Sequence, residues 1–97
     1  MTGYRFLRPA EEEMTNASLF YDTACARLGA VFIDEVQHVI SILRESPQLG
    51  QLVAPTLRRV LLNRFPFTLI YSVESDVILI VAVAHQRQRP DYWKNRV

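Results

Sequence analysis

The chain has 97 residues, of which 49% are hydrophobic and 22% charged, and its formal net charge is +1. This composition is typical of a folded globular domain and excludes an intrinsically disordered chain, which would combine low hydrophobicity with high net charge. The length predicts a single domain over residues 1–97.

The N-terminal part of the sequence predicts a strand followed by a helix. Aromatic residues two apart in Tyr4–Leu7 indicate a short strand. Pro9 fits the first turn of a helix, where its missing N–H is not needed. Apolar residues then recur at spacings of three and four, at Met14, Ala17, Tyr21, Ala24 and Leu28. We interpret Gly29 as the left-handed residue that ends this helix.

A second helix is predicted directly after the first. Its apolar face consists of Phe32, Ile33, Val36, Val39, Ile40 and Leu43. Pro47 and Gly50 are expected to end it. Because the link between the two helices is very short, they should lie antiparallel as a hairpin.

The C-terminal part changes to the alternating pattern of strands. The expected elements are a loop over 48–57, a strand around Val60 and Leu62, a turn at Phe65–Phe67, a strand over Thr68–Glu74, a turn at Ser75–Asp76 and a strand over Val77–Ala84. Val77–Ala84 is apolar at every position, so it should be buried on both faces of the sheet. The predicted fold class is therefore α+β, with an N-terminal strand, an antiparallel helical hairpin and a three-stranded antiparallel meander with a short C-terminal tail.

Several classes of protein are not supported by the sequence. Val77–Ala84, the longest purely apolar run, has eight residues, whereas a membrane-spanning helix needs roughly 20. The N-terminus lacks the pattern of a secretory signal. Cys25 is the single cysteine, so we expect no internal disulfide and no cysteine-based zinc site. A reducing cytoplasm is the predicted location.

The charges are unevenly distributed along the chain. Residues 1–57 have four arginines against seven acids, a net charge of −3, and residues 58–97 have seven basic residues against three acids, a net charge of +4. Six of those seven cations are arginine, whose planar guanidinium suits phosphate and carboxylate groups. The asymmetry indicates an anionic partner for the basic half, or else a solvated surface whose charges balance across the fold.

Polar, cationic and aromatic residues follow the last predicted strand. Such a position is rigidly held yet open to solvent, which suits a binding or reactive site. Arginines of the preceding strand could converge with them to hold phosphates or a carboxylate-rich partner. The candidate target-binding residues are Arg58, Arg59, Arg64, His85, Arg87, Arg89, Tyr92, Trp93 and Arg96.

These residues also have structural interpretations. The alternatives are a backbone cap for His85, an apolar plug formed by Tyr92 and Trp93, and ion pairs of Arg59 and Arg64 with Glu74 or Asp76. Glu11–Glu13 is interpreted as a solvated helix start. No Gly-rich phosphate loop, HExxH or GxSxG pattern is present, so we expect no cofactor and no metal.

The combination of these segments resembles the ParE/RelE superfamily of type II toxin–antitoxin toxins. The segments that carry the resemblance are Phe20–Gly29 with Phe32, the break at Pro47 and Gly50, Arg58-Arg59, Phe65–Tyr71, Ile80–His85, Arg87, Arg89-Pro90 and Tyr92-Trp93. The resemblance covers essentially the whole chain and implies a small antiparallel sheet with a helical hairpin against it. It also implies a bacterial growth-inhibiting toxin that is neutralised by a cognate antitoxin, ParD-like or of another family.

Two activities divide that superfamily, and the resemblance implies different roles for each. RelE-like members cleave mRNA in the ribosome without metal, and in this chain the nuclease candidates would be His85, Arg59, Arg87 and Tyr92. Leu61 and Thr68, however, stand where such nucleases tend to have lysine and arginine. This departure favours a ParE-like toxin that poisons DNA gyrase. Whether the chain is an enzyme stays open, with an mRNA endonuclease or a degenerate, non-toxic antitoxin-binding homologue as alternatives.

Overall fold

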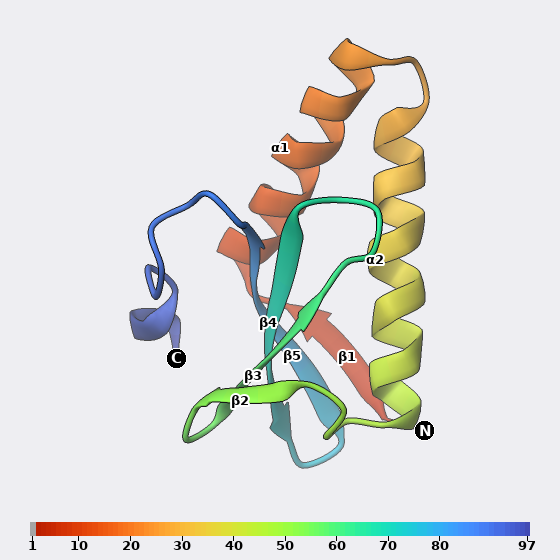
Figure 1. Cartoon of the computed structure of the whole chain (residues 1–97). Helices are drawn as coiled ribbons and strands as arrows, with labels where there is room; N and C mark the ends of the chain where they lie inside the picture. Colours follow the sequence, from red (N-terminus) through yellow and green to blue (C-terminus); the bar gives the residue numbers. More distant parts are fainter. Residues whose placement is uncertain (1) are drawn as a thin grey trace.

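The computed structural model describes residues 2–97 and contains one five-stranded sheet with two helices. The elements are β1 (Gly3–Phe6), α1 (Arg8–Ala24), α2 (Leu28–Glu45), β2 (Gln51–Ala54), β3 (Leu57–Leu61), β4 (Phe67–Glu74), β5 (Val77–His85) and a short 3-10 helix, η1 (Lys94–Arg96). The strand order is β1-β5-β4-β3-β2. β1 runs parallel to β5 and the other neighbours are antiparallel. The predicted α+β fold is confirmed (Figure 1).

The sheet has one strand more than the sequence predicted. β2 lies in the segment expected to be a loop and pairs with β3 at the edge of the sheet, with a register shift between Leu52 and Ala54. Leu52 is mostly exposed, so the segment lacks the alternation of a half-buried strand. Its strand conformation depends on backbone pairing with β3, which a local sequence pattern does not reveal.

β5 is buried on both faces, as its continuous apolar sequence predicted. Ile78 and Ile80 pack with the helices, and Leu79 packs on the opposite face of the sheet. A register shift against β4 lies at Val81 and places it beside Ala82 in the second cluster. The C-terminal tail, residues 86–97, covers this second face through Trp93 and turns back beside the sheet (Figure 1).

The two helices form the predicted hairpin, but the role expected for Gly29 was wrong. α1 ends at Ala24, and α2 already begins at Leu28, which was expected in the first helix. The left-handed residue of the connection is Arg27, with φ of 71°. Gly29 lies inside α2, where its N–H donates to Asp22 Oδ1 at 2.7 Å. It is needed for the close approach of the helices, because a Cβ there would overlap the Ser18 carbonyl oxygen.

Within the described residues, no helix is both long enough and apolar enough to cross a membrane.

We expect Gly29→Ala to destabilise the fold, although alanine is the better helix former. The added methyl group must push α1 away from α2, and overpacking of this kind costs about 1–3 kcal/mol. The free energy of unfolding from urea denaturation checks this. Gly3→Ala is the matched control, because a Cβ there would have its nearest neighbour at an ordinary 3.7 Å. Equal stability of the two variants would contradict the close-approach argument.

Candidate functional site

A cavity of about 390 Å³ opens on the face of the sheet that the helices leave free. Its floor is apolar and includes Leu61, Ile70 and Ala84, from three neighbouring strands. The tail supplies the opposite wall. Because successive side chains of a strand alternate between faces, these floor residues share the side of the sheet away from α1 and α2. The site therefore combines a rigid strand floor with a wall built from the chain terminus.

Five of the predicted site residues line this cavity. They are Arg59, His85, Arg89, Tyr92 and Trp93. Arg59 also donates to the Gln51 side chain at 3.1 and 2.9 Å, which holds it against β2. The guanidinium of Arg89 makes no hydrogen bond or ion pair within residues 2–97 and is exposed. The structure thus brings five of the nine predicted residues together at one cavity.

The structure places Arg58 and Arg64 away from the cavity. Arg58 points to the helix side of β3 and donates to the carbonyl oxygens of Gln48 and Gly50. Arg64 pairs with Glu35 of α2 at 3.0 Å. The expected ion pairs with Glu74 or Asp76 are therefore wrong for Arg64, and also for Arg59, which bonds to an amide instead. Strand alternation separates Arg58 from Arg59, and the turn after β3 carries Arg64 towards α2.

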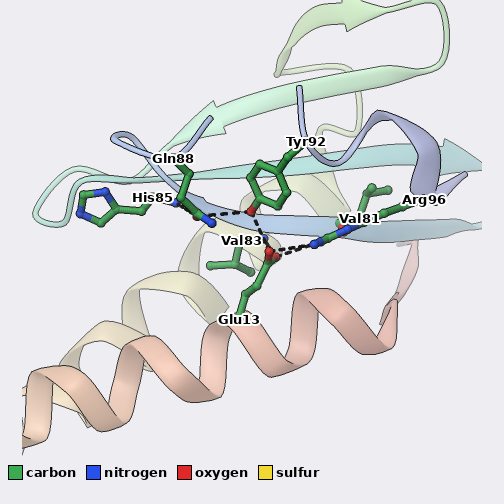
Figure 2. A network of polar contacts seen from close by, with 7 residues as sticks. All are labelled: Glu13, Val81, Val83, His85, Gln88, Tyr92 and Arg96. Atoms are coloured by element: carbon green, nitrogen blue, oxygen red, sulfur yellow. Dashed lines mark hydrogen bonds and ion pairs between the residues drawn. The ribbon is translucent and has the colours of Figure 1, made fainter. Parts of the chain in front are cut away.

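Tyr92 and Arg96 are joined to Glu13 on α1 in a network that the sequence did not reveal (Figure 2). The phenol of Tyr92 donates to Glu13 Oε2 at 2.6 Å, and Arg96 forms a bidentate pair with both carboxylate oxygens at 3.0 and 2.9 Å. Glu13 was interpreted as part of a solvated helix start, which is wrong. Its position in an acidic triplet gives no sign of partners that lie about 80 residues further along the chain.

The network changes the acid–base properties of its members. Burial raises the pKa of the Tyr92 phenol, and the hydrogen bond to the negative Glu13 carboxylate raises it further. The hydrogen bond to Glu13 also raises the pKa of Arg96. The Tyr92 phenol therefore keeps its proton in the hydrogen bond to Glu13 and is poorly suited to exchange protons with a substrate.

His85 is also engaged by the fold. Its ring packs edge-on against Phe67, with ring centroids 5.0 Å apart. Its Nδ1 accepts a hydrogen bond from the Arg87 N–H at 3.0 Å, as the backbone-cap alternative proposed. Figure 2 shows the imidazole pointing away from Tyr92 and Glu13. His85 thus contributes to the cavity lining while its ring is directed elsewhere.

Trp93 is the apolar plug of the structural alternative and also a wall of the cavity. It is 6% exposed and belongs to the cluster on the second face of the sheet. Arg87, by contrast, does not line the cavity, and its side chain is exposed. No group of three or more His, Cys, Asp or Glu side chains in the described part of the chain is placed to hold a metal ion.

A family model described as "ParE toxin of type II toxin-antitoxin system, parDE" matches residues 4–90. The chain belongs to the ParE toxin family. Ten chains of solved structures match it, among them one from the chromosomal ParDE TA system of P. aeruginosa. That match has a TM-score of 0.64 and 18% identity, and covers 88% of this chain and 96% of the other. No curated protein matches the sequence. The family-model match confirms the predicted resemblance. The structural match shows that this chain has the same fold.

The contact between Arg64 and Glu35 in this ParE chain is expected to weaken in acid. Burial alone would raise the pKa of Glu35, but hydrogen bonds from the N–H groups of Asn63 and Arg64 and from the Arg64 guanidinium outweigh it, so the pKa lies below its ordinary value of 4.5. A carboxyl group with a lowered folded-state pKa stabilises the fold fully above its unfolded pKa. That contribution is lost as the pH falls below 4.5 and through the folded-state pKa.

We therefore expect Glu35→Gln to lower the free energy of unfolding by about 1–3 kcal/mol at neutral pH. The wild-type and variant curves should converge on acidification, because the protonated Glu35 no longer has its charge. Urea denaturation across the acidic range measures this. Glu45→Gln, at an exposed position, is the control. A gap between wild type and Glu35→Gln that persists unchanged at low pH would contradict the assignment.

Proposed function

We propose that this ParE-family chain is the toxic component of a type II toxin–antitoxin system and inhibits growth by poisoning DNA gyrase. The match of the family model over residues 4–90 supports the toxin part of this proposal. A cognate antitoxin neutralises the toxin in this scheme. The choice of gyrase over RNA depends on the chemistry that the cavity can perform.

The observation that carries this choice is that the fold already engages the phenol of Tyr92 and the ring of His85, the two candidate acid–base groups at the cavity. Metal-free RNA cleavage requires one group to activate the 2′-hydroxyl and another to protonate the leaving oxygen. The Tyr92 phenol donates a hydrogen bond to Glu13, and the His85 ring packs on Phe67. Leu61 and Thr68 line the cavity at the positions where the nuclease pattern has cations. An apolar floor with a cationic rim instead favours docking of a protein surface.

The helical hairpin of the toxin exposes apolar side chains to which the proposed antitoxin binds. Leu19 and Phe20 of α1 are 58% and 67% exposed. Elsewhere on the molecule, β2 lies at the edge of the sheet, where an extended segment of a partner can pair with its backbone. We expect the antitoxin to contact the hairpin and a sheet edge, and to raise the melting temperature of the toxin by binding its folded form.

An mRNA endonuclease is the second candidate, because Arg59, Arg89 and His85 line one cavity. In that mechanism the arginines would hold phosphates, and His85 would have to rotate away from Phe67 to act as acid or base. A degenerate toxin that binds an antitoxin without a lethal target is the third candidate.

Purified toxin is expected to inhibit DNA supercoiling by gyrase, or to trap cleaved DNA, at micromolar concentration. Gel electrophoresis of plasmid topoisomers measures both effects, and toxin premixed with its antitoxin is the control. Intact gyrase activity together with cut transcripts after induction in cells would establish the endonuclease instead. Harmless overexpression without the antitoxin would favour the degenerate homologue.

The cavity rim predicts which substitutions weaken the toxin. Arg59→Gln with Arg89→Gln removes the two cations of the rim and leaves the apolar floor unchanged. We expect inhibition of gyrase to weaken by about tenfold, an effect that shrinks at high salt because rim charges act mainly on association. Arg27→Asn is the control, since it removes an exposed arginine at the far hairpin tip and asparagine tolerates the left-handed backbone there. Equal losses in both proteins would show that the cavity is not the target surface.

A further inference from the structure

β5 is longer than the strand that pairs with its outer edge. β1 pairs with residues 77–80, and the last backbone contact is the Leu7 N–H donating to the Ile80 carbonyl oxygen at 2.9 Å. Beyond this point the chain leaves the sheet to begin α1. The remaining edge of β5 has no neighbouring strand within residues 2–97. Its buried backbone groups need other partners, because unpaired polar groups are costly inside a protein.

Side chains take the place of the missing strand (Figure 2). The backbone groups involved belong to alternate residues, as in a regular ladder. The contacts are Arg96 Nη1 to the Val81 carbonyl oxygen at 3.0 Å, the Val83 N–H to Glu13 Oε1 at 3.0 Å and the His85 N–H to Gln88 Oε1 at 2.8 Å. Two of these three side chains come from the tail, and the third comes from α1.

Glu13 connects the body of the protein to the tail. Its carboxylate accepts hydrogen bonds from Val83 of the body and from Tyr92 and Arg96 of the tail. The side chains of Glu13 and Arg96 are each 19% exposed, so water and salt screen this pair less than an exposed one. The Arg96 guanidinium also lies over the Tyr92 ring, 5.0 Å from its centroid.

The tail has few backbone ties to the sheet. The Gln86 N–H donates to the Pro66 carbonyl oxygen, which anchors the start of the tail. After it, the backbone hydrogen bonds of the tail that the structure describes join residues three apart. Asp91 has φ of 66°, an uncommon conformation for a residue other than glycine. Burial of Trp93 and the polar contacts of the tail side chains therefore hold residues 86–97 in place, a condition under which local opening precedes global unfolding.

We propose that Glu13 is the positioning residue of the candidate site and that residues 86–97 form a strap latched by its carboxylate. The strap carries Arg89, Tyr92 and Trp93, which line the cavity. Release of the latch moves this wall and bares the edge of β5 from Val81 to His85, while the rest of the sheet stays folded. The inference rests on the proposed function in one respect, namely that the cavity is the target surface.

Two variants test the latch from its two ends, in the purified full chain. Glu13→Gln removes the charge on α1, and Arg96→Gln removes its partner on the strap. Their matched controls are Glu12→Gln, at an exposed neighbouring position, and Lys94→Gln, which removes an exposed cation of the same tail. Hydrogen exchange at single amides is the first measurement.

The expected result is faster exchange at the strap-covered edge of β5 alone. The Val83 and His85 amides should exchange at least about tenfold faster in both latch variants. The amides of Ala82 and Ala84, which alternate towards β4, should keep their wild-type rates. Both control proteins should behave as wild type. Arg96→Lys, which restores the charge with a single donor group, should recover part of the protection.

Trp93 provides an independent readout, because it is the single tryptophan of the chain. Its emission should shift to longer wavelength and its quenching by acrylamide should rise several-fold in Glu13→Gln and Arg96→Gln, with a melting transition that stays cooperative. Should Glu13→Gln fail to fold, Arg96→Gln decides, because it leaves α1 intact.

Unchanged Val83 and His85 amides together with a shielded Trp93 in both latch variants would overturn the proposal. So would exchange of Ala82 and Ala84 at the same raised rate, since the opening would then be global unfolding. These measurements use the toxin alone, so a failure of the gyrase assay leaves them unaffected.

Discussion

The burial of β5 on both faces is the constraint on which the rest of the structure depends. A strand with apolar side chains on each side needs two covers, and a chain of this length has few elements to provide them. The helical hairpin covers one face, and Trp93 with the tail covers the other. The cavity exists because the tail covers this second face incompletely, leaving Leu61, Ile70 and Ala84 as its floor.

The same constraint explains why polar side chains form hydrogen bonds with the edge of β5. β1 is too short to pair with the whole strand, so backbone groups at Val81 and Val83 are left beside a buried surface. Arg96 and Glu13 satisfy them and each other. Tyr92 and Arg96 thereby become part of the architecture of the site. Such a role differs from that of Arg89, whose guanidinium stays available to a partner.

Some polar side chains at the cavity are held by the fold, and others are free to contact a partner. This division indicates what chemistry the cavity of this ParE-family chain can support. The cavity keeps two cations and an apolar floor, while its ionisable ring groups are held by neighbours. Such a surface can attract a partner through its charges and fit its shape, but it is poorly suited to proton transfer. A toxin that acts by binding a protein fits this arrangement better than one that cleaves a phosphodiester.

The sequence alone determined the helical hairpin, the turn at Ser75–Asp76 and the doubly buried strand, because the periods of 3.6 and 2 and the turn residues act over short distances. It also predicted a shared surface for the cations and aromatic residues near the last strand, and the cavity brings together Arg59, Arg89 and Trp93 of that set but not Arg58, Arg64 or Arg87. Tertiary structure decided the rest. The β2 strand depends on pairing with β3, and Gly29 is required by the approach of α1. Glu13 reaches its partners only after folding brings residues about 80 positions apart together, and no local pattern encodes such a contact.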